Sequence, residues 1–109
     1  MDVLKVASQI EKKITLLEHG RIGLDELARN NANAQSDYDK AVRVATIKLK
    51  DENKYPATLI DKIAKGECHQ EKANAVLAEC LYKIQIVKIN TIQAELNGWQ
   101  SIFRHLDEK

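Results

Sequence analysis

Residues 3–17 read VLKVASQIEKKITLL, and the apolar side chains of this stretch recur every three or four positions. This spacing places them on one side of an α-helix, where they can pack against a second helix. The period continues to residue 49, and Asp2 precedes it as a suitable N-cap. The sequence therefore predicts one long helix over residues 3–50. Its expected contact positions are Val3, Ala7, Ile10, Ile14, Leu17, Arg21, Leu24, Ala28, Asn31, Gln35, Tyr38, Val42, Ala45 and Leu49.

Two glycines lower the helical propensity of this stretch. Gly20 and Gly23 each cost about 0.5–1 kcal/mol relative to alanine inside a helix, and a break between two shorter helices is the alternative. Because Leu17 and Leu24 stay one heptad apart across them, we expect a continuous or kinked helix.

Two polar residues, Asn31 and Gln35, occupy contact positions. Buried polar groups can fix the register of paired helices and the number of partners, at a cost in stability. A thinly packed, partly hydrated stretch is the simpler interpretation.

A short helix follows a polar linker at residues 51–55. Pro56 suits a first helical turn because it lacks an N–H that would stay unsatisfied there. Residues 57–65 predict an amphipathic helix, and Gly66 stands where a C′ glycine is expected. The predicted apolar face of this helix is Leu59, Ile60 and Ile63.

A second long helix is predicted over residues 67–106. Its last six apolar positions keep a clean three-four spacing, and Gly98 does not change their phase. The apolar positions are Ala73, Val76, Leu77, Cys80, Leu81, Ile84, Val87, Ile89, Ile92, Leu96, Trp99, Phe103 and Leu106.

Two long helices joined by a short one must fold back to bury their apolar sides. We predict one all-α domain over residues 1–109, a coiled-coil-like antiparallel helical hairpin with a short helical cap. The expected contacts join Ile10, Ile14 and Leu17 to Trp99, Phe103 and Leu106, and bring Leu49 near Cys68.

The chain holds more apolar residues than two paired helices can cover. Leaving several Ile and Leu side chains in water would forfeit several kcal/mol at about 25 cal/mol per Å². We therefore expect a homo-oligomer, preferably a dimer that forms a four-helix bundle, with a different protein partner as the alternative. The expected oligomer interface is Ile84, Ile86, Ile89 and Ile92.

Composition excludes several classes of function. The 109 residues include 17 Lys and Arg and 16 Asp and Glu, so the formal charge of +1 argues against a strongly basic nucleic-acid binder and an acidic DNA mimic. Cys68 and Cys80 would lie about three turns apart on one helix, too far for a disulfide. No apolar run is long enough to cross a membrane. We expect a soluble protein of the cytoplasm.

No pattern in the sequence predicts catalysis. Cys68 and His69 are adjacent on a helix and face different ways, so they lack the spacing of zinc ligands. The acidic pairs lack the Glu-x-x-His form of di-iron bundles. There is no phosphate-binding glycine loop and no nucleophile motif. We predict a protein that is not an enzyme and needs no metal or cofactor.

Two segments carry a resemblance. Residues 56–66, PATLIDKIAKG, and residues 93–104, QAELNGWQSIFR, resemble small helical proteins encoded by phages and prophages of Gram-positive bacteria. Such proteins are often encoded in early gene modules beside recombination or single-strand-binding proteins, and others inhibit host defence systems. The resemblance implies a viral protein that acts in the cytoplasm of a bacterial host, and it supplies no catalytic residues.

The first functional hypothesis is an inhibitor that binds a bacterial defence protein or sequesters its small signalling nucleotide. The alternatives are an accessory of phage recombination or replication, acting on single-stranded DNA or its binding protein, and a structural or assembly protein of a virion. The candidate partner-binding residues are Arg21, Arg29, Asn31, Tyr55, Lys62 and Lys65.

Overall fold

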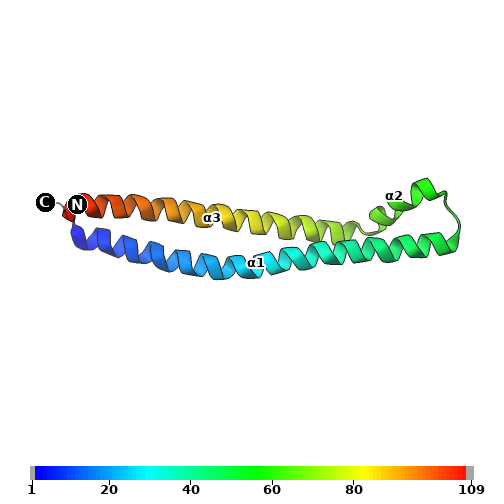
Figure 1. The fold of residues 1–109 in the computed structure, drawn as a ribbon, viewed down its shortest axis with the longest axis horizontal. Helices are drawn as coiled ribbons and strands as arrows, with labels where there is room; N and C mark the ends of the chain where they lie inside the picture. The colour runs from blue at the N-terminus through cyan, green and yellow to red at the C-terminus, as the bar shows by residue number, and fades with distance from the viewer. Residues whose placement is uncertain (1, 108–109) are drawn as a thin grey trace. The chain divides into compact units, whose positions relative to one another are not determined.

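The computed structural model describes residues 2–107, and its three elements are all α-helices. Helix α1 spans Val3–Glu52, α2 spans Ala57–Glu67 and α3 spans His69–Asp107 (Figure 1). No strand occurs within residues 2–107. The all-α prediction is confirmed, and each observed helix begins and ends within two residues of its expected bounds.

Helix α1 begins at the predicted N-cap. Asp2 Oδ1 accepts a hydrogen bond of 3.0 Å from the backbone N–H of Leu4, which satisfies a donor that has no partner inside the helix. The helix then passes through Gly20 and Gly23 without interruption, and neither glycine has a positive φ. The expectation of a helix that continues across both glycines is confirmed.

Helix α1 ends where the backbone becomes left-handed at Asn53, with φ of 53°. The N–H of Asn53 donates to the carbonyl oxygen of Lys50 at 3.3 Å. Asparagine tolerates this conformation better than most residues that have a side chain, and it is a common alternative to glycine after a helix. The local sequence therefore ends α1 without help from distant residues.

Helix α2 starts as expected and ends differently. Pro56 is its N-cap, with φ of −60° and ψ of 146°. The prediction that Gly66 lies at C′ is wrong, because Gly66 is inside the helix and has no positive φ. The single residue between α2 and α3 is Cys68, whose N–H donates to the carbonyl oxygens of Ala64 and Lys65. These two bonds satisfy the end of α2, so no left-handed glycine is needed.

The helices form two compact units. Unit 1 combines residues 1–26 with residues 82–109, and unit 2 is residues 27–81. Each unit contains a stretch of α1 beside a stretch of α3, and in both units the two stretches run antiparallel (Figure 1). Unit 2 also contains α2. The predicted antiparallel pairing is therefore present in each unit.

The register of unit 1 differs from the predicted one. Lys13 Nζ lies 2.6 Å from Glu95 Oε2, and the side-chain amide of Gln85 donates to the carbonyl oxygen of Gly20 at 3.1 Å. Counting along both helices from Lys13 and Glu95 places Ile10 level with residue 98, next to Trp99 of the expected set. Leu17 falls level with residue 91, about two turns from Trp99, so its expected contact with that set is wrong.

The side of α1 that faces α3 in unit 1 is rotated from the expected one. Ile14 is exposed and so is Arg21, although both were expected at contact positions. Leu17 is buried as expected, and Val6 and Gly20 are buried although they were not expected at contact positions. An α-helix drifts by about 20° per heptad relative to a strict seven-residue repeat. A constant heptad pattern therefore cannot mark the covered side along the whole of α1.

The core of unit 2 lies where α2 packs on the end of α1. Leu49, Ile60 and Ala64 are buried together, and the partly buried Val42, Ala45 and Ile63 pack around them. Leu49, expected near Cys68, belongs to this cluster with α2. Leu59 is exposed at 44%, so its assignment to the apolar face of the short helix is wrong, and Ala64 takes that place.

Helix α3 turns a different side toward α1 than its apolar pattern predicts. Val76, Leu77 and Leu81 of unit 2 are exposed, and so are Ile84 and Val87 of unit 1. Most covered positions of this half of α3 carry smaller or more polar side chains, and the half-buried Ile86 is the apolar exception. These smaller or more polar residues include Ala75, Ala78, Tyr82 and Gln85. From residue 89 onward the predicted positions Ile89, Ile92, Leu96, Trp99, Phe103 and Leu106 are all covered at least in part.

Candidate functional site

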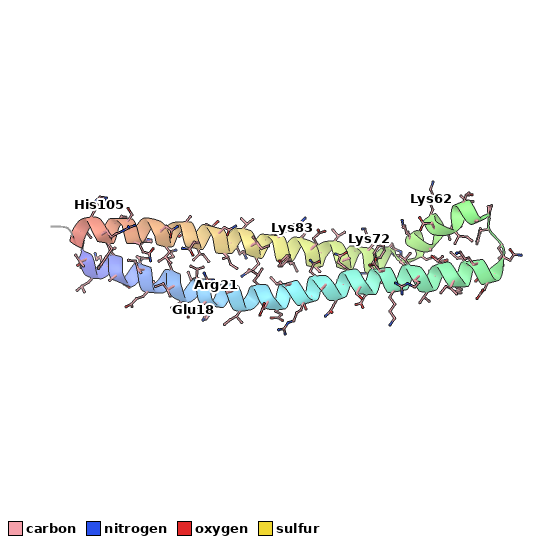
Figure 2. The ribbon with its side chains drawn as sticks, viewed as in Figure 1. Glu18, Arg21, Lys62, Lys72, Lys83 and His105 are labelled. Atoms are coloured by element: carbon pink, nitrogen blue, oxygen red, sulfur yellow. The ribbon has the colours of Figure 1, made fainter. Side chains whose placement is uncertain are left out.

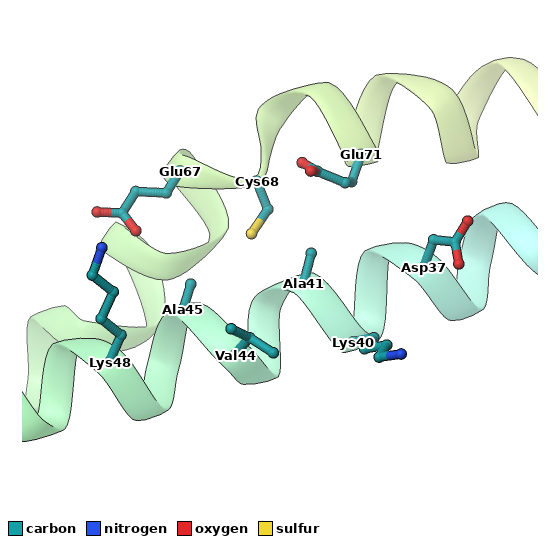
Figure 3. Close-up of a pocket in the computed structure, with 9 residues that line it drawn as sticks. All are labelled: Asp37, Lys40, Ala41, Val44, Ala45, Lys48, Glu67, Cys68 and Glu71. Carbon is teal, nitrogen blue, oxygen red and sulfur yellow. The ribbon is translucent and has the colours of Figure 1, made fainter.

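Unit 2 has a hollow between α1 and the junction of α2 with α3 (Figure 3). Cys68 directs its sulfur toward α1, where the side chains of Ala41 and Ala45 point back at it (Figure 3). Small side chains at these positions leave the space open. The lining residues are Asp37, Lys40, Ala41, Val44, Ala45, Lys48, Glu67, Cys68 and Glu71.

A second hollow continues along the same side of unit 2. Its residues follow those of the first at helical spacing on both α1 and α3, so the two hollows share one face of this helix pair. We call this surface the open face of unit 2. The second hollow is lined by Leu27, Asn30, Ala34, Asn74, Leu77, Ala78 and Leu81.

The two sides of the open face differ in charge. Helix α1 contributes Lys40 and Lys48, whereas Glu67 and Glu71 stand on the side of α2 and α3. None of these four side chains forms an ion pair within residues 2–107. The open face therefore carries a basic rim and an acidic rim that are both available to an incoming molecule.

The side chains on the two sides of the open face also differ in size. In the second hollow the α3 side presents Leu77 and Leu81, which are 58% and 43% exposed. Across from them α1 presents the small Ala34 and the polar Asn30. Leucine side chains exposed to this extent beside small residues are typical of surfaces that pack against another helix.

Cys68 is a packing residue of this face rather than a nucleophile. Burial raises the pKa of its thiol above the ordinary value of 9.0, and the charges of Glu71 and Glu67 raise it further. A thiol with a raised pKa holds little thiolate near neutral pH, and the thiolate is the reactive form. The arrangement favours a neutral, unreactive Cys68.

Unit 1 has a different surface, on the side of α1 that faces away from α3. Leu4 and Ile22 are the most exposed large apolar side chains there, at 77% and 73%. They lie about five helical turns apart, which places them on the same side of α1. A shallow hollow lies between them, and we call this surface the outer face of unit 1. The hollow is lined by Ser8, Glu11, Lys12, Thr15 and Leu16.

The structure does not bring the candidate partner-binding residues together. Arg21 is exposed on α1 in unit 1, and Arg29 is exposed on α1 in unit 2. Asn31 is half-buried and accepts a hydrogen bond of 3.2 Å from the side-chain amide of Gln35.

The remaining candidates lie near the cap. Tyr55 is exposed in the linker before α2. Lys62 points away from α1 (Figure 2), and Lys65 pairs with Asp61 at 3.2 Å. None of the candidate partner-binding residues lines the open face.

The candidate oligomer-interface residues lie on more than one side of α3 in unit 1. Ile84 is 50% exposed. Ile86 and Ile92 are half-buried, and Ile89 approaches Gly20 of α1. The open face was missed because its residues do not form a motif. A helical-wheel plot of charge could have found its basic rim, since Lys40 and Lys48 are about two turns apart.

Within residues 2–107, no three His, Cys, Asp or Glu side chains are placed so that they could hold a metal ion together. No described helix combines the length and the apolar character needed to cross a membrane. Comparisons with protein-family models, with curated proteins and with solved structures found no match to the chain.

Proposed function

We propose that this chain is a non-enzymatic binding protein that blocks or sequesters a component of a bacterial defence system in the cytoplasm of the host cell. The supporting observation is the amount of apolar surface left uncovered. Within residues 2–107, 15 large apolar side chains are exposed, whereas the buried apolar residues number eight and include two alanines and a cysteine. Exposed apolar surface on this scale is typical of proteins that bind other proteins.

The outer face of unit 1 is the proposed contact surface for the defence protein. Leu4 and Ile22 would insert into apolar pockets of the partner, and the half-exposed Leu16 lies between them along the helix. Arg21, adjacent to Ile22, would add a charged contact at the rim, as interface arginines often do. The identity of the partner class rests on the resemblance to phage-encoded helical proteins.

The test uses bacterial strains that each carry one defined defence system. The full chain is expressed in every strain and the strains are challenged with a phage that the system restricts. Phage plating should recover in one strain, and the effector protein of that system should co-purify with the tagged chain. The double variant Leu4→Ser, Ile22→Ser should lose both effects, since it removes the apolar anchors without touching a buried residue.

Val76→Ser is the matched control, because Val76 is exposed on α3 in unit 2 and lies outside both hollows. It should behave like the unaltered chain. If the Leu4→Ser, Ile22→Ser variant restores phage plating as well as the unaltered chain does, the proposed surface is contradicted. If the unaltered chain leaves restriction unchanged in every strain, the proposed function is contradicted.

The geometry gives no specific support to the alternative functions. Binding of single-stranded DNA uses exposed aromatic rings on which bases stack. Trp99 and Phe103 are half-buried at the positions of α3 that face α1 in unit 1. A structural or assembly role in a virion is likewise favoured by no feature of the described residues.

A further inference from the structure

We propose that the open face of unit 2 is the binding site for a second copy of this chain, related to the first by a twofold axis that runs along the groove between α1 and α3. The register of this unit and the distribution of charged, large and small side chains over the face support this dimer. The dimer does not depend on the proposed action on a defence system.

Two contacts fix the register of unit 2. The side-chain amide of Gln35 donates to the carbonyl oxygen of Ala75 at 3.1 Å, and Lys72 Nζ lies 5.1 Å from the centre of the Tyr38 ring. Because the two helices run antiparallel, residues at the same level have a constant sum of residue numbers, and in both pairs this sum is 110. Lys40 is therefore level with Glu71 along the groove to within about one residue, and Ala34 is level with Leu77 to the same precision.

A twofold axis along the groove keeps each level and exchanges the two sides. It lays α1 of one copy on the α3 side of the other, and the same contact is made twice, as in any twofold interface. Lys40 of one copy then approaches Glu71 of the other, and Leu77 packs over Ala34. The basic rim meets the acidic rim, and the large side chains meet the small ones. Asp37, the acidic residue on the α1 side, is level with Asn74, which is neutral.

The charge pattern disfavours the other face-to-face arrangement where its axis is level with Val44. A twofold axis across the groove at that level would lay α1 on α1, and Lys40 of one copy would approach Lys48 of the other. Like charges opposed in an interface disfavour association strongly.

The first measurement is the mass of the full chain by analytical ultracentrifugation over a range of concentrations. The unaltered chain should form a dimer. Lys40→Glu with Lys48→Glu makes both rims acidic, and Glu67→Lys with Glu71→Lys makes both rims basic. Each double variant alone should associate at least about tenfold more weakly, because like charges then oppose each other in both contacts. An equimolar mixture of the two should recover the dimer.

The chain that carries all four substitutions tests the direction of the axis. Its rims have exchanged signs, so it should dimerise with itself and should not form mixed dimers with the unaltered chain. Preferential formation of mixed dimers would overturn the proposed axis, because that result requires α1 to lie on α1. Circular dichroism of each variant verifies that the helices are kept.

A matched pair of aspartate variants tests the apolar contact. Leu77→Asp should weaken the dimer, whereas Val76→Asp, at an exposed position outside the hollows, should not. The Leu4→Ser, Ile22→Ser chain should remain a dimer even where it no longer binds a defence protein, so the two proposals can fail separately. A monomeric unaltered chain at all concentrations, or a dimer that is insensitive to the rim charges, would overturn this inference.

Discussion

Gly20 of α1 and Ile89 of α3 approach so closely that a Cβ atom on Gly20 would lie 3.1 Å from Cγ1 of Ile89. This distance is shorter than ordinary van der Waals contact between carbon atoms. The same approach lets Gln85 donate its side-chain amide to the carbonyl oxygen of Gly20. The glycine therefore serves helix packing in unit 1 rather than a turn, since its φ is negative like that of its helical neighbours.

Substitution of alanine for glycine should distinguish this position from an open one. Gly98→Ala should raise the free energy of unfolding by about 0.5–1 kcal/mol, because alanine favours the helix and nothing lies within 4 Å of the new Cβ. Gly20→Ala should raise the free energy of unfolding by much less or not at all, since Ile89 must shift to admit the methyl group. Urea unfolding at one fixed protein concentration measures both. Equal stabilisation by the two substitutions would show that the close approach carries no energetic weight.

Gln35 should contribute more to stability than a glutamine with the same local bond. It bonds to Asn31 within α1 and to Ala75 across the helix pair. Gln70 makes the same type of bond to Asn74 on the exposed side of α3 and no bond to another helix among the described contacts. Gln35→Ala should lower the free energy of unfolding by about 1 kcal/mol or more, whereas Gln70→Ala should lower it by about 0.2–0.5 kcal/mol. A smaller loss for Gln35→Ala would argue for the hydrated interpretation of this stretch.

The raised pKa of Cys68 predicts a loss of stability at high pH. The folded state favours the protonated thiol, because burial and then Glu71 and Glu67 raise its pKa above 9.0. The stabilising contribution is complete below the pKa of the unfolded chain and is lost as pH rises through the pKa of the folded chain. The free energy of unfolding should therefore fall more steeply at alkaline pH, from the pKa of the unfolded thiol upward, in the unaltered chain than in Cys68→Ala.

Urea unfolding at a series of pH values measures this slope. The exposed Cys80 supplies the control, and Cys80→Ala should keep the slope of the unaltered chain. Parallel curves for Cys68→Ala and the unaltered chain would rule out a titrating contribution from Cys68.

Substitution by alanine and by glycine should affect stability in opposite order at Asn53 and Asn97. Asn53 is left-handed at the end of α1, so Asn53→Ala should lower the free energy of unfolding by about 1 kcal/mol and Asn53→Gly should not lower it. Asn97 lies inside α3 and is exposed, so there alanine should be tolerated and glycine should be destabilising by about 0.5–1 kcal/mol. Thermal unfolding followed by circular dichroism compares the four variants. The same order at both positions would contradict a role for the left-handed residue at the end of α1.

The apolar pattern of α1 predicted its covered side well in unit 2 and less well in unit 1. Ala28, Gln35 and Leu49 are covered as expected, whereas Ile14 and Arg21 are not. A drift of about 20° per heptad adds up to roughly one residue over five heptads. A single repeat fitted to the whole helix is therefore correct over only part of its length.

The open face of unit 2 could not be predicted from the sequence for a different reason. Its residues come from segments about 20 to 55 positions apart, and their relation depends on the register between α1 and α3. That register follows from contacts such as Gln35 with Ala75 and Lys72 with Tyr38. A side-chain amide that bonds a backbone carbonyl on another helix leaves no periodic signal in the chain.

The sequence by itself determined the three helices, both ends of α1 and the start of α2. Asp2 caps α1, Asn53 ends it and Pro56 starts α2 through interactions with near neighbours in the chain. Only the tertiary structure decided which side of α3 packs against α1 in unit 2. The chain could have covered the larger Val76, Leu77 and Leu81, and instead it covers Ala75 and Ala78. Small residues at the contact let two helices approach closely enough for Gln35 to reach a backbone carbonyl, and the larger side chains remain exposed on the other sides of α3.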